Sequence, residues 1–283
     1  MSAQLTRHDR LNKEARSATE RIITWLGEID TNIAAVLGTG WGGSVKLIKS
    51  MKLADIHPLF ATLADLPGHA RMIGIAIIGG KRVLVLSGRI HMYEGNRDAV
   101  YLLMRILWEL GIRKLILTSA SGGMRDCIRK GDLVVVMDIV SHCPSPVDGP
   151  PFPVPGPMIR HDLMQTIWGS VPVGRVHIGN LAVNQGPALE SPGNRLRVDQ
   201  PGILGVGMSG SAETECFASF VEQDELETGK HAFVVPITCI SNGLKDPHSH
   251  KGNTEAMIAN QKRLASMLIH VVEQTARQRL KKR

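Results

Sequence analysis

The chain has 283 residues, of which 43% are hydrophobic, so it can bury a substantial core within one α/β domain spanning 1–283. No stretch approaches the roughly 18 apolar residues of a membrane-spanning helix, and the polar N-terminus lacks the apolar core of a secretory signal. The four cysteines lack CxxC spacing and predict reduced thiols in a cytoplasmic protein. The net charge is +7, and basic residues gather at 277–283 without interleaved aromatic residues. We therefore expect a solvated helix end there, with no nucleic-acid and no membrane partner.

Strand-like and helix-like segments alternate along the first half of the chain, which predicts an α/β fold. In chain order we expect a helix within 1–30 that covers much of Asn12–Leu26, a buried strand at Ile33–Leu37 entering the glycine-rich turn Gly38–Gly43, strands at Ile73–Ile78 and Arg82–Ser87, and an amphipathic helix over Asp98–Leu110. The two strands before that helix are joined by Gly79-Gly80-Lys81, which is typical of a hairpin. Because a hairpin adds antiparallel strands to a βαβ series, we predict a mixed central β-sheet flanked by helices.

The second half continues the alternation and contains a proline-rich loop. We expect strands at Leu115–Thr118 (followed by the small-residue turn Ser119–Gly123), Leu133–Val140, Val176–Val183, Leu204–Met208 and Ala232–Ile240. The segment 144–157 holds seven prolines and two glycines and predicts a loop within the domain. After the potential cap Asn253, a basic helix is predicted over 254–283.

The glycine-rich motif Gly38–Gly43 follows a predicted strand, a position in which exposed backbone N–H groups suit an anion. Its spacing also matches the GxGxxG pattern of nicotinamide-dependent enzymes, which requires a following helix, a parallel strand and an acidic residue about 20 positions later. Asp55 is the one candidate for that acid, and an antiparallel hairpin follows it instead. The motif by itself indicates an anion more than it indicates NAD.

A second motif, GRIHMYEG, directly follows the strand that ends at Ser87. If the chain stays extended there, Arg89, His91 and Tyr93 project to one side, because side chains alternate along a strand. Arginine is suited to bidentate capture of phosphate. The alternative interpretation is a polar loop with a structural ion pair between an arginine and Glu94.

Further polar residues follow glycines or the ends of predicted strands. These are His69 in PGHA, Glu190 and Ser191 in GPALES, Met208 and Ser209 in VGMS, and Asn242 in ISN. Ligands in α/β enzymes bind where strands end, although each motif alone is compatible with an ordinary turn. His248 and His250 lie near Asp246, but without further ligands at suitable spacing we expect no metal site.

In the ordered set of these motifs, from about residue 33 to residue 260, the chain resembles the trimeric purine nucleoside phosphorylases. The motifs are GTGWGG, PGHA, GRIHMYEG, SASGG, GPALE, VGMS and ISN. The resemblance implies a homotrimer with a mixed sheet that needs no cofactor, takes a purine nucleoside, and uses inorganic phosphate as co-substrate. Its implied phosphate site consists of Thr39, His69, Arg89, the Ala120 backbone and Ser209.

The same resemblance implies a nucleoside site beside the phosphate. His91, Tyr93 and Met208 would contact the ribose, Glu190 and Asn242 would hold the base, and Gly122 and Leu189 would lie beside it. His91, Asn242 and Glu190 would be the catalytic groups. A Glu190 carboxylate would accept the N1–H of a 6-oxopurine, which adenine lacks, so inosine and guanosine are the expected substrates.

Several residues of the nucleoside half depart from the family pattern. Leu189 stands where a phenylalanine commonly stacks on the base, and Thr254 stands where animal-type enzymes carry a histidine for the sugar 5′-hydroxyl. His248 or His250 could replace that histidine. Ser119 and Ser121 replace the usual Asn-Ala pattern, and the segment after Val140 lacks the Arg-Phe-Gly stretch that supplies an aromatic residue to the neighbouring subunit, with Phe152 as a candidate replacement.

Three alternatives stay open at this point. A methylthioadenosine phosphorylase shares the fold and phosphate chemistry, but that family usually carries aspartates near the base, where this chain has Asn242 and Gly243. A catalytically weakened homologue that binds nucleoside or phosphate would explain the altered nucleoside half. An NAD-dependent enzyme is the third.

Overall fold

The structure is a computed structural model that describes residues 6–63, 70–148, 158–184, 195, 197–228, 232–246 and 250–280, with the backbone alone at 223–228 and 250–254. Its strands are β1 (Ile33–Leu37), β2 (Lys49–Lys52), β3 (Met72–Ile78), β4 (Lys81–Ser87), β5 (Lys114–Gly123), β6 (Leu133–Ser141), β7 (Val176–Val183), β8 (Ile203–Gly207) and β9 (Phe233–Asn242). In the described part of the chain they form one sheet in the order β2-β3-β4-β1-β5-β8-β7-β6-β9. The sheet mixes parallel and antiparallel neighbours, which confirms the predicted fold class.

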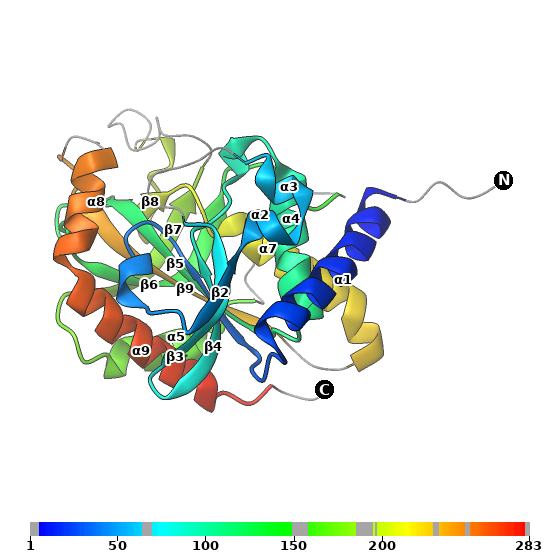
Figure 1. The fold of residues 1–283 in the computed structure, drawn as a ribbon. Helices are drawn as coiled ribbons and strands as arrows, with labels where there is room; N and C mark the ends of the chain where they lie inside the picture. The colour runs from blue at the N-terminus through cyan, green and yellow to red at the C-terminus, as the bar shows by residue number, and fades with distance from the viewer. Residues whose placement is uncertain are drawn as a thin grey trace.

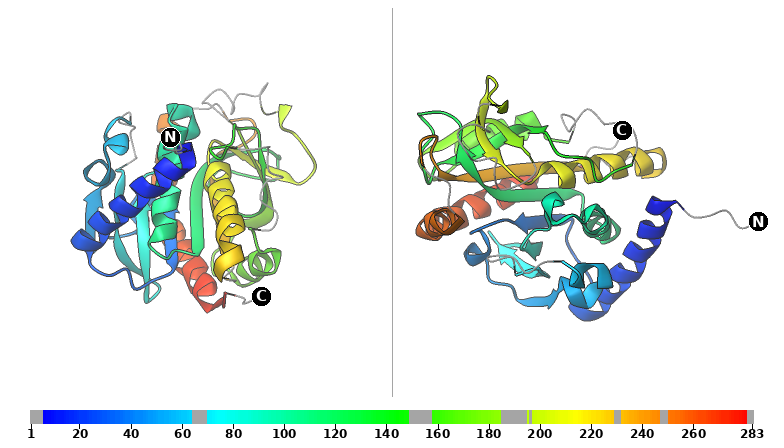
Figure 2. Two further views of the ribbon diagram at one scale, coloured as in Figure 1. Left: turned by 90° about the vertical axis from the view of Figure 1, so that its right-hand side faces the viewer. Right: turned by 90° about the horizontal axis from the view of Figure 1, so that it is seen from above.

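Helices cover the sheet on two sides (Figures 1 and 2). They are α1 (Arg7–Leu26), α2 (Leu53–Ile56), α3 (Pro58–Ala61), α4 (Arg97–Glu109), α5 (His161–Ser170), α7 (Ser211–Thr228), α8 (His250–Ala259) and α9 (Gln261–Arg277), with 3-10 turns η1 (Gly42–Ser44) and η2 (Met92–Glu94). On one side α4 packs between α1 and α7, and on the other α5 packs against α9. The view from above in Figure 2 shows the sheet between these two groups of helices.

Each side of the sheet buries its own apolar core. Along β4, Leu84 and Leu86 join the core under α1, α4 and α7, whereas Val83 and Val85 join the core under α5 and α9. This division follows the alternation of side chains along a strand. Because both faces are covered by helices, the strand is a continuous apolar run instead of an alternating one.

Strand β5 is the central strand of the fold because it has three neighbours. It pairs with β1 and β9 in parallel, and its last two residues, Gly122 and Gly123, pair antiparallel with β8. Strand β9 also pairs with β6, so β5, β8, β7, β6 and β9 close into a ring. This closure joins the ends of β5, β8 and β9, which carry three of the sequence motifs.

Several predicted elements are confirmed. Strand β1 has the predicted limits, and β3 and β4 form the predicted antiparallel hairpin. Helix α4 ends before Gly111, whose φ of +82° is the left-handed conformation typical of a helix C-terminus. The first helix begins earlier than Asn12, at Arg7, because Thr6 and Asp9 form a capping box in front of it.

Two predictions about element limits are wrong. The small-residue segment Ser119–Gly123 is not a turn, since β5 runs through it and pairs with β9 as far as Asn242. The C-terminal stretch is not one helix from 254 onward. Helix α8 ends at Ala259 and α9 begins at Gln261, because the Asn260 side-chain amide donates to the Ala256 carbonyl (2.8 Å) and competes with the helical backbone.

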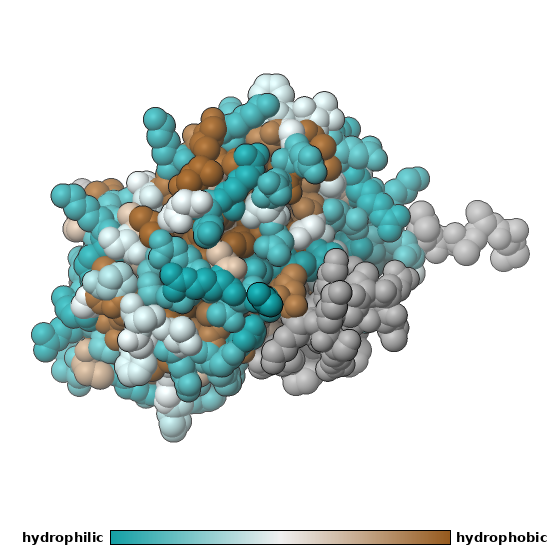
Figure 3. All heavy atoms as spheres, turned by 90° about the horizontal axis from the view of Figure 1, so that it is seen from below, coloured by the Kyte–Doolittle hydropathy of each residue, from teal (hydrophilic) through white to brown (hydrophobic). Residues whose placement is uncertain are grey.

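The face seen from below in Figure 3 shows apolar residues in separate groups among polar ones. No helix in the described ranges is long and apolar enough to cross a bilayer. The four cysteines are free thiols, two of them buried. Within the residues that the structure describes, no group of three or more His, Cys, Asp or Glu side chains is arranged to hold a metal ion.

Candidate functional site

The glycine-rich turn after β1 lies directly against β5. A Cβ on Gly38 would lie 2.5 Å from the Thr118 carbonyl oxygen, so only glycine allows this approach. The Trp41 indole N–H donates to the Ser119 carbonyl (2.9 Å) and anchors the turn from inside the core. A three-residue 3-10 turn follows instead of a helix, and the next strand, β2, pairs antiparallel with β3 instead of lying parallel beside β1 as in a dinucleotide-binding unit. The NAD interpretation is therefore wrong.

The predicted phosphate residues gather where neighbouring strands end. Strands β4, β1 and β5 are parallel, so Arg89 and Thr39, which follow β4 and β1, lie at the same sheet edge as Ala120 near the end of β5. Ser209 reaches this edge from β8, whose last residue, Gly207, lies so close that a Cβ on it would be 3.7 Å from the Ala120 carbonyl oxygen. The strand topology therefore brings four of the five predicted phosphate-binding residues to the same end of the sheet.

Arg89 is the central side chain of this cluster and is only 2% exposed. Its Nη1 donates to Ser209 Oγ (2.5 Å), and its Nε pairs with Glu213 Oε1 (2.7 Å). Glu213 stands in the first turn of α7, a helix that the sequence analysis missed. The signal that could have found it is a glutamate three residues after Gly210, because a glutamate at that position of a helix often bonds back to the cap.

The extended backbone that was the condition for Arg89, His91 and Tyr93 to project to one side continues only as far as His91. A 3-10 turn begins at Met92, and the rings of His91 and Tyr93 stack with centroids 4.6 Å apart. Burial and the neighbouring Glu94 raise the pKa of Tyr93, so its phenol stays protonated at neutral pH. His91 is 7% exposed.

Glu94 forms the ion pair that the alternative interpretation proposed, although its partner is Arg71 and not Arg89. Its Oε2 lies 2.5 Å from Arg71 Nη2, and its Oε1 accepts the backbone N–H of His91 (2.7 Å). The carboxylate therefore fixes the His91–Tyr93 turn, while Arg89 turns to Glu213.

The predicted base residues that the structure describes lie together at the ends of β5 and β9. Gly122 and Asn242 are paired residues, and Asn242 is 3% exposed. The Ser241 hydroxyl donates to Asn242 Oδ1 (3.1 Å), an orientation in which the carboxamide presents its Nδ2 as the donor. A Cβ on Gly122 would lie 3.4 Å from that same Oδ1.

Arg195 is a second buried arginine at this edge, and the sequence analysis did not select it. It is 2% exposed, and its Nη1 donates to the carbonyls of Gly123 (3.0 Å), Gly243 (2.9 Å) and Leu244 (2.9 Å). It ties the end of β5 to the turn after β9. No motif contains it, so only the fold reveals its place.

The remaining predicted residues lie outside the described part of the chain. They are His69, Leu189, Glu190 and the candidate replacements Phe152 and His248, together with the side chains of His250 and Thr254. Met208, the last predicted ribose residue, directly follows β8 and precedes Ser209.

Comparisons with known proteins agree with this geometry. The family model of the phosphorylase superfamily matches residues 32–273. Purine nucleoside phosphorylase 1 of Geobacillus stearothermophilus is 29% identical over 246 residues, which cover 80% of this chain and 85% of that protein. The mouse (Mus musculus) purine nucleoside phosphorylase is 26% identical over 200 residues, covering 64% and 69%.

Solved structures show the same fold. The purine nucleoside phosphorylase of Schistosoma mansoni in complex with inosine superposes with a TM-score of 0.76 at 21% identity, covering 92% of this chain and 96% of that one. The same protein in complex with adenosine gives a TM-score of 0.75. The sequence match over most of the chain and the shared fold lead to one conclusion: this chain belongs to the phosphorylase superfamily and is an enzyme of the purine nucleoside phosphorylase family.

Proposed function

We propose that this enzyme catalyses the reversible phosphorolysis of 6-oxopurine (2′-deoxy)ribonucleosides, inosine and guanosine, to the free base and (deoxy)ribose 1-phosphate. The observation that carries the proposal is the buried Arg89 guanidinium, held at Ser209 where β4, β1, β5 and β8 meet. The proposal includes a cytoplasmic homotrimer that acts in purine salvage and needs no cofactor besides the co-substrate phosphate.

Phosphate would bind in the first half of the site. Arg89 presents a planar, permanently charged donor to its oxygens, and the Ser209 hydroxyl stands 2.5 Å from that donor. Thr39 and the Ala120 backbone lie at the same strand ends. His69 would complete this half.

Cleavage would then separate the charges of the nucleoside. As the C1′–N9 bond breaks, its electron pair moves onto the purine, and positive charge builds on the sugar. A phosphate oxygen attacks C1′ and neutralises that charge. The Asn242 Nδ2 would donate to the purine N7, where negative charge develops, in the manner of an oxyanion hole.

Base recognition would depend on Glu190. A carboxylate accepts the N1–H of hypoxanthine or guanine but opposes the lone pair on N1 of adenine. Sites that pair a substrate donor can reject an analogue lacking it by about 10⁴-fold. The complex of the Schistosoma neighbour with inosine supports the choice of substrate, whereas its complex with adenosine makes the base preference the part most in need of a test.

One assay set tests the proposal: release of free base from inosine, guanosine, adenosine and methylthioadenosine, with and without phosphate. We expect phosphate-dependent cleavage of inosine and guanosine and no cleavage of adenosine. Preferred cleavage of methylthioadenosine would instead identify a methylthioadenosine phosphorylase. Saturable nucleoside binding without turnover would identify a weakened homologue.

The role of Glu190 has its own test. The Glu190→Ala variant should lose affinity for inosine while its KM for phosphate stays nearly unchanged. An equal loss for both substrates would contradict a base-binding role. Sedimentation velocity of the purified enzyme tests the trimer, and a monomer at working concentration would contradict it.

A further inference from the structure

Glu213 is a buried carboxylate whose two oxygens hold two different segments. It is 3% exposed and stands in the first turn of α7. Its Oε1 lies 2.7 Å from Arg89 Nε, and its Oε2 accepts the backbone N–H of Gly210 (3.0 Å). One side chain therefore connects the segment after β4 with the segment after β8.

Both segments carry residues of the proposed phosphate site. Gly210 directly follows Ser209, whose hydroxyl accepts from Arg89 Nη1 (2.5 Å). Arg89, Ser209 and Glu213 thus form a closed set in which the carboxylate holds the arginine directly and the serine through the next backbone N–H.

The pairing at Nε determines where the rest of the guanidinium points. The five N–H groups of an arginine lie in one plane in a fixed fork, so fixing Nε fixes the directions of the Nη donors. A guanidinium that is 2% exposed also needs a counter-charge, because an unpaired buried charge is costly. Glu213 supplies that charge whether or not an anion is bound.

We infer that Glu213 is a positioning residue for phosphate: it orients the Arg89 guanidinium and the Ser209 hydroxyl toward one point without touching the anion itself. This inference rests on the proposed function, since it assigns the anion at Arg89 to the co-substrate. It adds a residue that none of the sequence motifs contains.

The Glu213→Gln variant tests the inference with almost no change in volume. Glu213 Oε2 accepts the Gly210 N–H and Oε1 lies 2.7 Å from Arg89 Nε, but a carboxamide has only one oxygen, so its NH₂ must face either Arg89 Nε–H or the Gly210 N–H. We expect KM for phosphate to rise about tenfold or more, and a tenfold rise corresponds to about 1.4 kcal/mol of binding free energy. KM for inosine should change less than about twofold.

The Glu213→Asp variant is the conservative comparison. It keeps the charge and both acceptor oxygens but is one methylene shorter, so it should lie between wild type and Glu213→Gln in KM for phosphate. The matched control is Glu109→Gln. Glu109 pairs with another buried arginine, Arg105 (2.7 Å), at the far end of α4, and its loss should lower the melting temperature without changing either KM.

The two proposals fail in different ways. A wild-type enzyme that releases no base from nucleosides with phosphate overturns the proposed function. A wild-type enzyme that does so, with a Glu213→Gln variant whose KM for phosphate is unchanged, overturns only the positioning role and leaves Glu213 a structural residue like Glu109. If neither Glu213 variant folds, the wild-type NMR signal of the Arg89 Nε–H decides: slow exchange with solvent, with and without phosphate, supports the inference, and fast exchange overturns it.

Discussion

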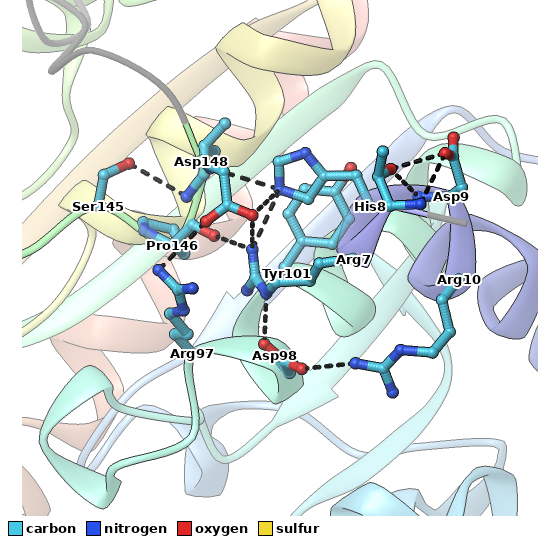
Figure 4. A network of polar contacts seen from close by, with 12 residues as sticks. Arg7, His8, Asp9, Arg10, Arg97, Asp98, Tyr101, Ser145, Pro146 and Asp148 are labelled. Carbon is cyan, nitrogen blue, oxygen red and sulfur yellow. Dashed lines mark hydrogen bonds and ion pairs between the residues drawn. The ribbon is translucent and has the colours of Figure 1, made fainter. Parts of the chain in front are cut away.

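Two groups of charged residues in this protein make similar contacts in different surroundings. In the first, Arg89 and Glu213 are paired at 2.7 Å with their side chains 2% and 4% exposed. In the second, Arg7 in α1 pairs with Asp98 in α4 (2.7 Å) and with Asp148 (3.1 Å), as Figure 4 shows. The side chains of Arg7, Asp98 and Asp148 are between 17% and 43% exposed.

The groups also differ in how many partners each charge has. In the second group Asp98 also pairs with Arg10 (3.1 Å), and Asp148 also pairs with Arg97 (3.2 Å). Loss of one side chain there leaves other partners and water, whereas loss of one member of the buried pair leaves a charge away from water. How much an ion pair contributes to stability therefore depends more on its burial, and on whether other partners can replace a lost one, than on the distance between the charges.

The largest expected effect comes from breaking the buried pair. The Arg89→Met variant should lose about 3–5 kcal/mol of unfolding free energy, because the Glu213 carboxylate would stay buried without its partner. It should also lose phosphate-dependent base release. Urea unfolding and the base-release assay measure the two effects.

Replacing both members separates stability from function. The double variant Arg89→Met with Glu213→Leu should regain most of the lost stability, since a buried pair replaced by apolar side chains is often neutral or stabilising by about 1–4 kcal/mol. Its activity should stay lost. A double variant with recovered activity would show that Arg89 is not needed to bind phosphate.

The second buried arginine, Arg195, allows a similar test in the nucleoside half of the proposed site. In Gly122→Ala the added Cβ would lie 3.0 Å from Arg195 Nη2 and 3.4 Å from Asn242 Oδ1. We expect a loss of about 1–3 kcal/mol from overpacking and a KM for inosine raised about tenfold, with KM for phosphate unchanged. Gly169→Ala in α5, where nothing lies within 4 Å of the new Cβ, is the matched control and should change neither KM.

A smaller effect is expected in the surface group. Asp98→Asn should cost no more than about 1 kcal/mol of unfolding free energy, and the difference from wild type should shrink in high salt, because the group is partly exposed to solvent and its charges are screened. Urea unfolding at low and high salt measures this. A salt-independent loss as large as that of Arg89→Met would contradict the comparison.

The smallest effect is a pH dependence at His8, whose ring stacks on Tyr101 with centroids 4.6 Å apart. Burial lowers the pKa of His8 below 6.5, so folding favours the neutral imidazole, which can accept the Asp148 N–H (3.4 Å). This contribution is present above pH 6.5 and is lost as the pH falls through the lowered pKa. Between pH 7.5 and pH 5, His8→Phe should therefore lose less melting temperature than wild type, by about 1 °C. An equal loss in both proteins would show that His8 does not contribute.

Local patterns in the sequence were enough for the elements that form by short-range rules. The five apolar residues of β1, the glycine-linked hairpin of β3 and β4, and helix α4 with its terminal glycine were predictable because alternation, turn chemistry and helix capping act over a few residues. The motif order also predicted Arg89 and Ser209 in one site, and the structure places them in contact.

Contacts between distant segments could be decided only by the tertiary structure. The segment Ser119–Gly123 contains small residues typical of a turn, yet it is strand because β9 and β8 supply partners for its backbone. Glu213 is one of 26 acidic residues, and its sequence neighbourhood shows only a helix start. It meets Arg89 because the segments that follow β4 and β8 come together, although β1 and β5 lie between the two strands in the sheet. Burial then requires the two charges to pair.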